Sequence, residues 1–323
     1  MTISYGDNFA ALLITRWRGS IWKSVWKELA VWLILYYAIS VSYRFWMTQK
    51  QKDTFEDLAQ MFDHYVSNLA LTFVLGFYIG KVVERWWDQF MLIPWPDRTM
   101  STVCYAYSLN TDEHKMVRHT IARYLNLTAV LAWRNVAPQV MDMYPTVDSI
   151  VDSGLMTTDE RRMYDAAQTD PGRWHLPVRW AQRMFHEHLD RSLVQPPVER
   201  DFLVEIKDYR HNFQQIFSYD WVCIPMVYTH VATLATYGFF IFCLIGRQFL
   251  DTEKKYECCK VDFYFPVFTC TQFLFYVGWC KVGQDLMRPF GSDDDDIEVV
   301  RILRRNLIVS FSMAHEHEWP DIQ

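Results

Sequence analysis

Four consecutive carboxylates, Asp293–Asp296, are the residues of this chain with the clearest capacity for chemistry. They follow a Pro-Phe-Gly turn that ends at Gly291. Carboxylates and main-chain carbonyls on such a loop are hard oxygen donors, and Ca²⁺ takes about six to eight of them. The spacing of an EF-hand is missing, however, and acidic runs are commonly solvated surface. On these residues alone, a calcium loop and a solvated acidic face both remain open.

The second feature is an uncharged segment within Asn68–Trp87 that turns basic and Trp-rich at its end. This profile is typical of a helix leaving a bilayer, which is apolar inside and cationic and aromatic at the head groups. Leu69, Phe73 and Phe77 recur every four residues and are expected to share one helix face. Such a stripe either packs against a neighbouring helix or lines a narrow pore.

Three histidine positions give weaker signals. The pairs at 186–188 and 315–317 place two imidazoles at i and i+2, which fall on opposite sides of a helix, so surface histidines are favoured over a metal site. His230 lies in an apolar segment. It is either an intramembrane switch or a neutral, hydrogen-bonded core histidine.

The composition indicates a membrane protein with a large aqueous part. Hydrophobic residues make up 51% and aromatic residues 17%, yet 22% are charged and the net charge is −6. The acidic balance and the lack of a basic run argue against nucleic-acid binding. No Gly-rich phosphate loop, HExxH or GxSxG motif occurs, which argues against an enzyme.

Four apolar segments are long enough to be membrane spans, at 29–46, 66–83, 221–245 and 263–280. The segment at 48–63 is expected to be a polar loop facing outward. Four spans place both termini in the cytoplasm, as the cations before the first span also indicate, namely Arg16, Arg18, Lys23 and Lys27.

The section from about 94 to 219 is polar and shows helical periodicity without strand-like alternation. Residues 118–133 form an amphipathic pattern, a capping box at Thr157 and Glu160 opens another helix, and 202–217 is a third long one. We therefore predict an all-α, multi-pass membrane protein. Its five segments are a cytosolic N-terminal segment at 1–27, spans one and two at 28–90, a cytosolic helical domain at 91–219, spans three and four at 220–283, and an acidic cytosolic segment at 284–323.

The centres of the predicted spans lack acidic and basic residues, which transporters and proton pumps normally need. A passive pathway, a membrane-anchored enzyme and a scaffold remain. A pore lined by Phe would favour anions, because ring edges carry the positive end of the quadrupole. An apolar constriction can also gate by dewetting.

In combination, several motifs give the chain a resemblance to the bestrophins, a family of calcium-activated chloride channels. The motifs run in order along the chain: TRWRGSIWK at 15–23, LTFVLGFYIGKVVERWW at 71–87, IPWPDR at 93–98 and FYVGWCKVGQDLMRPFGSDDDD at 275–296. Further similar segments occur at 144–157, 219–231, 244–250 and 305–311.

The resemblance implies a homopentamer in the cell membrane around one central pore for chloride and other small anions. Leu69, Phe73 and Phe77 would then form its hydrophobic neck. A second, cytosolic aperture would be lined by Pro197 or, after a one-residue slip, by Val198. The rival interpretation is a non-conducting membrane scaffold or channel regulator, in which the stripe only packs.

The resemblance also implies Ca²⁺ as the cofactor, held in a clasp that gates the neck from the cytosol. Asp293 and Asp296 would supply side chains. Main-chain carbonyls would come from the positions of Asp285 and Arg288, and from near Ala10 of the adjacent subunit. The chain departs from the family pattern in its shorter N-terminal segment and in the charged residues at 285 and 288.

Overall fold

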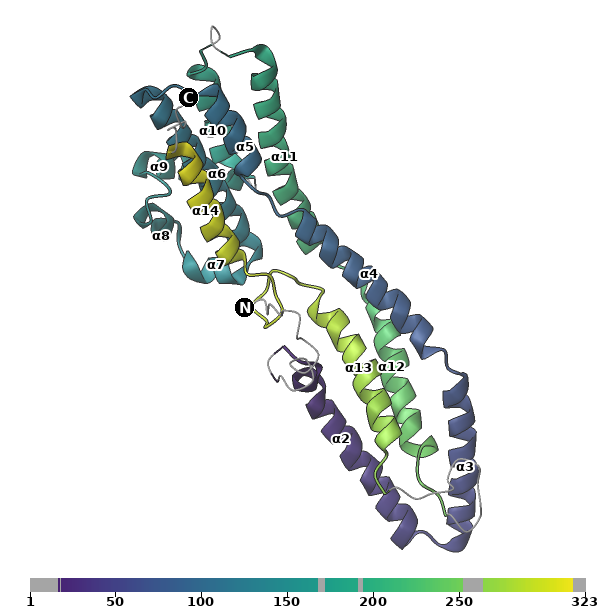
Figure 1. Ribbon diagram of the computed structural model, residues 1–323. Coiled ribbons are helices and arrows are strands. Elements are labelled where there is room, and N and C mark those ends of the chain that lie inside the picture. Colours follow the sequence, from purple (N-terminus) through teal and green to yellow (C-terminus); the bar gives the residue numbers. More distant parts are fainter. Residues whose placement is uncertain (1–16, 18, 168–171, 191–193, 252–263, 316–323) are drawn as a thin grey trace, which may run out of the picture. The chain divides into compact units, whose positions relative to one another are not determined.

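The structure is a computed structural model that describes residues 17, 19–167, 172–190, 194–251 and 264–315 (Figure 1). All regular elements in these ranges are helical, so the predicted all-α class is confirmed. The chain forms two compact units. We call Ile3–Trp87 with Cys223–Arg288 the apolar unit, and Asp88–Val222 with Pro289–Gln323 the polar unit.

The apolar unit holds the long apolar helices. Its described elements are α2 (Ile21–Val41), the π-helical turn η1 (Ser42–Trp46), α3 (Gln49–Asn68), α4 (Leu71–Met91) as far as Trp87, α12 (Met226–Gly246) and α13 (Val267–Asp285). Helices α2, α12 and α13 pack against one another. Their core includes Trp32, whose indole N–H donates to the Phe240 carbonyl at 2.9 Å.

Among the described residues, two helical stretches are long and apolar enough to cross a membrane, Ile21–Trp46 and Met226–Gly246. The pair α3 and α4, bent by 42°, would add a third if it forms one broken span. Helix α13 is not among them, and the expected span at 263–280 begins outside the described residues. A count of four spans therefore stays a prediction.

The segment at 48–63 is helical, so our expectation of a polar loop is wrong. Helix α3 begins with a capping box, in which the Thr48 side chain accepts the Gln51 N–H and the Gln51 side chain accepts the Thr48 N–H. Its polar composition is compatible with a helix because α3 packs one side against α12. On that side Ala59 and Val66 are buried, and the buried Glu56 accepts a hydrogen bond from the Tyr43 hydroxyl at 2.6 Å.

The single helix expected across 66–83 is also interrupted. Leu69 caps the end of α3 in an extended conformation (φ −78°, ψ 113°), and α4 starts at Leu71. Likewise, α11 (Pro196–Trp221) runs into the segment expected as span three, and α12 begins only after Pro225. Pro196 lies in the first turn of α11, where its missing N–H is not needed, whereas Pro225 is the N-cap of α12.

Helix α12 and helix α3 meet backbone to backbone at Gly246. A Cβ atom built on Gly246 would lie 2.8 Å from the Asp63 nitrogen and 3.0 Å from the Phe62 carbonyl carbon. The next residue, Arg247, pairs its Nε with the Asp63 carboxylate at 3.0 Å. The absence of a side chain at 246 therefore allows both the helix contact and the ion pair.

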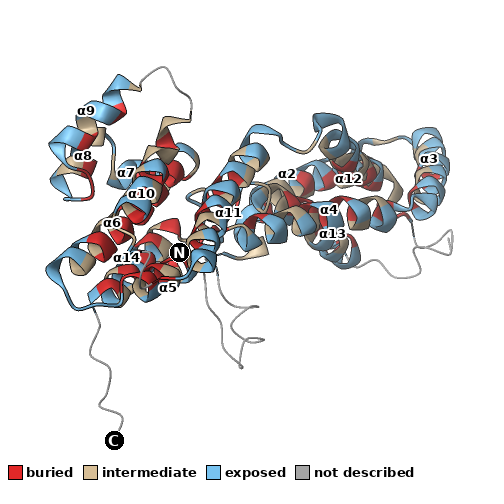
Figure 2. Cartoon of the chain, turned by 90° about the horizontal axis from the view of Figure 1, so that it is seen from above, coloured by how far each residue is buried: buried red, intermediate tan, exposed pale blue. Residues whose placement is uncertain are grey.

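The polar unit is built around α6 (Asp112–Val136). Around it lie α5 (Asp97–Ala106), α7 (Pro138–Met143), α8 (Val147–Asp152), α9 (Thr158–Ala166), η2 (Arg173–His175), α10 (Leu176–Glu187), α11 and α14 (Val299–His315). The predicted helix at 118–133 is confirmed as part of α6. It is not simply amphipathic, because nearly every side chain from Ile121 to Trp133 is buried (Figure 2).

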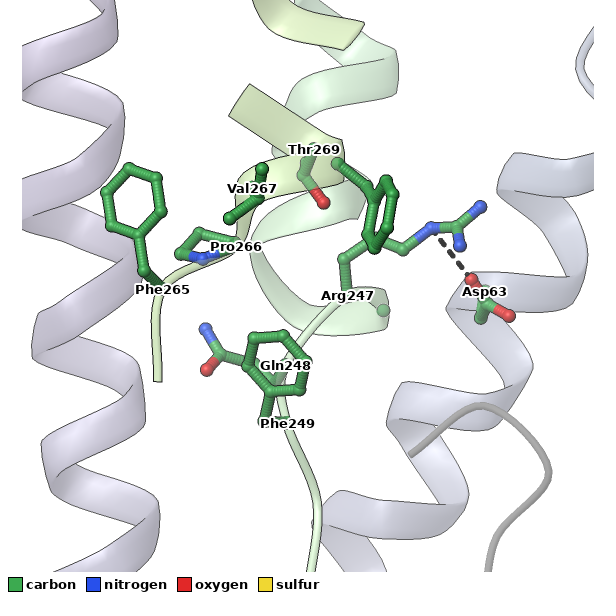
Figure 3. A pocket seen from close by; sticks show the side chains of 10 residues that line it. Asp63, Arg247, Gln248, Phe249, Phe265, Pro266, Val267 and Thr269 are labelled. Atoms are coloured by element: carbon green, nitrogen blue, oxygen red, sulfur yellow. Dashed lines mark ion pairs between the residues drawn. The ribbon is translucent and has the colours of Figure 1, made fainter. Parts of the chain in front are cut away.

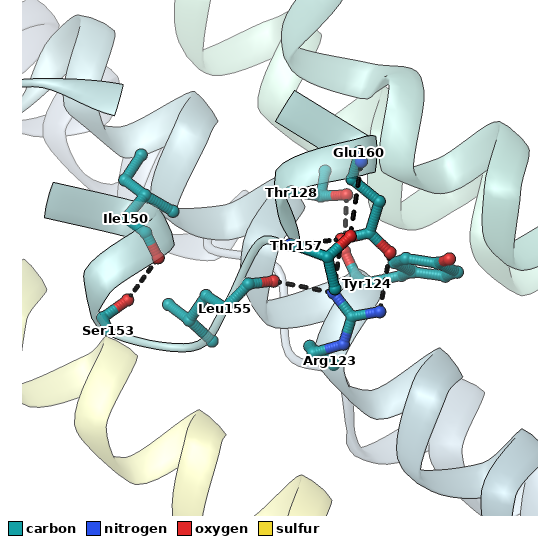
Figure 4. A network of polar contacts seen from close by, with 8 residues as sticks. All are labelled: Arg123, Tyr124, Thr128, Ile150, Ser153, Leu155, Thr157 and Glu160. Carbon is teal, nitrogen blue, oxygen red and sulfur yellow. Dashed lines mark hydrogen bonds and ion pairs between the residues drawn. The ribbon is translucent and has the colours of Figure 1, made fainter. Parts of the chain in front are cut away.

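A buried ion pair fixes the start of α9 against α6 (Figure 4). Arg123 donates to both carboxylate oxygens of Glu160, at 2.6 and 2.7 Å. The same carboxylate accepts the Thr157 N–H at 2.8 Å, which confirms the predicted capping box. Burial alone would raise the pKa of Glu160, but the hydrogen bonds from Arg123 and Thr157 outweigh it, and the pKa is lowered.

We expect Gly246→Ala to lower the stability of the apolar unit, because the added methyl group collides with main-chain atoms of α3. The cost should reach the range of about 1 to 3 kcal/mol that overpacking imposes. Thermal unfolding of the purified protein in detergent measures it. Gly238→Ala is the matched control in the same helix, since its Cβ would meet nothing within 4 Å. Equal melting temperatures for both variants would contradict the close contact.

We expect Glu160→Gln to destabilise the protein near neutral pH by about 2 kcal/mol, the scale of a hydrogen bond to a charged group. A carboxyl whose pKa is lower in the folded state contributes stability that is lost as the pH falls through that pKa. The difference in melting temperature from the wild type should therefore shrink below about pH 4.

Asp159→Asn makes the same charge change one residue away in an exposed pair with Arg162 and serves as the control. Exposed pairs contribute about 0 to 1 kcal/mol. A Glu160→Gln effect no larger than this control, or one independent of pH, would contradict the role of the buried pair.

Candidate functional site

Helix α4 buries one face and leaves the other uncovered by the described part of its own chain. Leu75, Tyr78 and Val82 are at most 1% exposed, whereas Phe73 and Phe77 are 66% and 61% exposed. The two exposed rings touch edge to face, with centroids 4.8 Å apart. The structure thus places Phe73 and Phe77 on a shared outward face, as predicted.

Leu69 stands apart from this helical register. It is 45% exposed but lies at the C-cap of α3, so it does not continue the α4 face by helix geometry. The glycines at 76 and 80 have nothing within 4 Å of a built Cβ. No neighbouring segment among the described residues therefore occupies the space beside them.

The acidic loop is tied to the polar unit before and after its carboxylates. Phe290 packs on Trp133 with centroids 4.8 Å apart, and Gln139 donates to the Gly291 carbonyl at 2.6 Å. The Ile297 N–H closes the loop on the Pro289 carbonyl at 2.8 Å. The position of the loop is thus set by packing and by main-chain hydrogen bonds.

Asp293 and Asp296 lie together on one turn of this loop. The Asp293 N–H donates to Asp296 Oδ2 at 2.6 Å, and the Asp296 N–H donates to the Asp293 carbonyl at 3.3 Å. Asp296 is buried and Asp293 is exposed. The turn therefore holds one carboxylate inward and one toward solvent.

Whether the other expected clasp residues lie beside this turn stays a prediction. Asp285 is the last residue of α13 and is exposed, as is Arg288. Both belong to the apolar unit, whereas the acidic loop belongs to the polar unit. Ala10 lies outside the described residues.

Within the described ranges, no three His, Cys, Asp or Glu side chains are grouped to hold a metal ion. Calcium also accepts main-chain carbonyls, so two carboxylates on one turn remain compatible with it.

The expected cytosolic aperture lies at the first turn of α11. Gln195 caps this helix, Pro196 and Pro197 open it, and the Val198 N–H donates to the Gln195 carbonyl at 3.1 Å. Pro197 is exposed and Val198 half-buried. Proline is well suited to a first turn, where its missing N–H is not needed.

The histidine pairs behave as surface groups where they are described. His186 contacts Glu199 at 2.7 Å and His188 contacts Glu113 at 2.9 Å. The second pair extends beyond the described residues after His315. His230 is exposed on α12, so the described part of its own chain does not hold it in a core.

A polar cluster that no sequence pattern indicated lies among the helices of the apolar unit. Glu28 of α2 accepts a hydrogen bond from the Tyr237 hydroxyl at 2.6 Å and pairs with Lys281 of α13 at 2.7 Å. The signal was available, since a glutamate and a lysine within apolar helices need partners. Glu28 and Lys281 are far apart in the sequence, so local spacing could not predict their pairing.

The apolar unit also contains a cavity of about 230 Å³ (Figure 3). Aromatic side chains of Phe249, Phe265 and Phe268 line it, and the Arg247–Asp63 ion pair lies at one end. Because that arginine is already paired with a carboxylate, the cavity presents a largely neutral surface. No sequence pattern pointed to it, since its walls come from three separate segments.

Comparison with known proteins identifies the class to which this helical, membrane-type chain belongs. A family model described as "Bestrophin, RFP-TM, chloride channel" matches residues 2–316. The chain is 43% identical to Bestrophin homolog 13 of Caenorhabditis elegans, over 98% of this chain and 79% of that protein. It is 42% identical to human Bestrophin-3 and 38% identical to human Bestrophin-1, each over 98% of this chain.

The chain therefore belongs to the bestrophin family, a family of membrane channels. It spans 48% and 55% of the two human proteins. Among solved structures, a point mutant of a bacterial bestrophin homolog from Klebsiella pneumoniae matches with a TM-score of 0.64. It is 13% identical and covers 91% of this chain and all of that one. This likeness supports the fold.

Proposed function

We propose that this chain forms a calcium-activated chloride channel in the cell membrane, with five copies around one pore and both termini in the cytoplasm. The observation that carries the proposal is the uncovered aromatic face of α4. Two phenyl rings more than half exposed on a helix whose opposite face is packed need either lipid, another copy or a pore beside them.

The chemistry of this face suits anion passage. Ring edges of Phe73 and Phe77 present the positive end of their quadrupole to a passing anion. They offer no hydrogen-bond acceptor that would hold a cation. Rings from five copies would also exclude water when close together, so a small widening could switch conduction.

The acidic loop supports calcium as the signal. Its turn carries the carboxylates of Asp293 and Asp296 on a loop that packing holds in place, and carboxylates are calcium's preferred ligands. Bound calcium would neutralise part of a run of four negative charges. The Asp285 and Arg288 carbonyls and one near Ala10 of the adjacent subunit complete the proposed ligand set.

The decisive experiment is reconstitution of the purified protein in planar bilayers under a chloride gradient, with calcium titrated on one side. Current that requires calcium and reverses near the chloride equilibrium potential supports the proposal. Silence at every calcium concentration, from protein shown to be an intact pentamer, favours the non-conducting scaffold, in which the α4 face serves assembly alone.

We expect replacement of Leu69, Phe73 and Phe77 by Ala to leave the pentamer intact and make the current largely independent of calcium. The apolar barrier would be gone, because the small methyl groups of alanine leave a wider, wettable constriction. The measurement is the ratio of current without calcium to current at saturating calcium.

The control removes two equally exposed phenyl rings from another helix, with Phe268→Ala and Phe275→Ala on α13. A pentamer that dissociates in the neck variant alone would assign the stripe to packing instead.

We expect Asp293→Asn with Asp296→Asn to raise the half-activating calcium concentration by about tenfold or more, since each amide removes a charged ligand. Asparagine keeps an oxygen that can accept the Asp293 N–H, so the turn is preserved. The control is Asp294→Asn with Asp295→Asn, which removes the same charge from the same run. Equal shifts in both double variants would indicate a general charge effect and place the site elsewhere.

A further inference from the structure

A histidine and an asparagine contact each other at the end of α3, directly before the proposed neck. His64 Nε2 lies 3.3 Å from Asn68 Nδ2, one helical turn further on. Leu69, the first residue of the proposed neck, follows Asn68 and caps the helix. These two polar side chains therefore lie where α3 leads into the proposed neck.

The pair lies on the side of α3 that faces away from α12. Ala59 and Val66, on the packed side, are at most 3% exposed. Successive residues of an α-helix are about 100° apart around its axis, so His64 lies roughly 140° from Ala59 and roughly 160° from Val66. His64 and Asn68 are both exposed. The described part of the chain thus leaves this side of α3 uncovered.

The ionisable groups of the segments packed on α3 have partners of their own. The Asp63 carboxylate pairs with Arg247 at 3.0 Å. The Glu56 carboxylate accepts the Tyr43 hydroxyl at 2.6 Å, and the Lys52 ammonium donates to a main-chain carbonyl of η1 at 3.3 Å. The other charged residues of η1 and of the segment that follows α12 are Arg44, which lies over the Tyr264 ring, and Asp251.

Few other charges lie near the imidazole of His64. Helix α12 carries no Asp, Glu, Lys or Arg, and its histidine, His230, lies near the end opposite to the α3 contact at Gly246. The neighbouring Tyr65 ring is 6.3 Å away, centroid to centroid. The nearest acidic residue on the same side of α3 is Asp57, about 10 Å along the axis. This exceeds the screening length of about 8 Å at physiological salt.

The contact with Asn68 is compatible with both charge states of the imidazole. An amide nitrogen only donates, so His64 Nε2 accepts the Asn68 N–H and the neutral ring carries its proton on Nδ1. When the ring gains a second proton, Nε2 becomes a donor. A half turn of the Asn68 amide then presents its oxygen as the acceptor. The ring can therefore be charged or neutral in the same place.

We propose that His64 is an anion-attracting residue at the outer mouth of the pore, where its protonated ring raises the local chloride concentration before the neck. This inference rests on the proposed channel function. The chain continues from the neck through α4 into the polar unit, which is cytosolic in that proposal, so α3 precedes the neck on the outer side. Five copies would place up to five positive charges around the mouth, and such a ring concentrates anions.

The test is the single-channel chloride conductance at saturating calcium, with the pH varied only on the side where calcium does not act. Histidine gains its charge between about pH 8 and pH 5. Over this range the conductance should rise about twofold or more at about 0.01 M salt, where the screening length is about 30 Å. The rise should disappear near 1 M salt, where that length is about 3 Å.

His64→Gln should abolish the rise, because glutamine stays neutral at every pH while its amide can still bond to Asn68. The matched control is His211→Gln on α11. His211 Nε2 lies 3.4 Å from Gln215 Nε2, also four residues on, so the same kind of pair is removed from the polar unit. This control should keep the full response to outer pH.

A second experiment tests the sign of the charge without any change of pH. His64→Cys is treated from the outer side with a cationic or an anionic methanethiosulfonate reagent, and the wild type is treated equally as the control. The cationic label should raise the conductance at low salt, and the anionic label should lower it. The same direction of change with both labels would overturn the inference.

The failure of this inference differs from the failure of the channel proposal. A wild type that carries no current at any calcium concentration overturns the channel proposal and the inference with it. A wild type that conducts, with a conductance that does not depend on outer pH, overturns the inference alone. A response to outer pH that persists in His64→Gln also overturns it, since another group would then be responsible.

Discussion

The apolar unit depends on how α4 is held, since its packed face contacts the neighbouring helices while its other face is uncovered by the described part of its own chain. A helix in lipid satisfies its own backbone, so side-chain contacts decide its placement. Leu75 and Val82 provide packing on the held side. The Tyr228 hydroxyl of α12 adds a hydrogen bond to the Phe77 carbonyl, which an apolar surface cannot supply.

The acidic loop of the polar unit also depends on contacts made by residues beside its carboxylates. Four adjacent negative charges repel one another, so a loop that carries them needs independent anchors. Phe290 supplies packing, and the closure from Ile297 to Pro289 supplies the main-chain frame. The Asp296 carboxylate accepts the Asp293 N–H within the same turn. The same geometry serves a simple acidic turn or a calcium loop.

Local signals predicted much of the fold. The capping box at Thr157 and the helix around 118–133 follow from residues within a few positions of each other, and both are present. The missed features depend on distant contacts. Helix α3 is polar, and its packing on α12 could not be read from its own residues. The helix end at Leu69 carries no Pro or Gly as a local mark, only Asn68 before it.

The site was predictable to a similar degree. Spacing placed Phe73 and Phe77 on one face, because i and i+4 neighbours are a property of any helix. The resemblance, rather than the pattern, singled out Asp293 and Asp296 within a run of identical residues. Nothing in the sequence indicated that Tyr228 would reach α4, since a tyrosine near the start of an apolar helix is equally typical of a membrane interface.

The contact at Gly246 has a consequence for how this chain can diverge. The atoms that a side chain at 246 would meet are main-chain atoms of Phe62 and Asp63. Every residue type carries those atoms, so no replacement at 62 or 63 makes room. A mutant at 246 thus has no local suppressor among side-chain changes. Recovery would require a shift of the whole of α3, and a genetic screen for second-site revertants should find them spread along the α3 and α12 contact rather than beside the glycine.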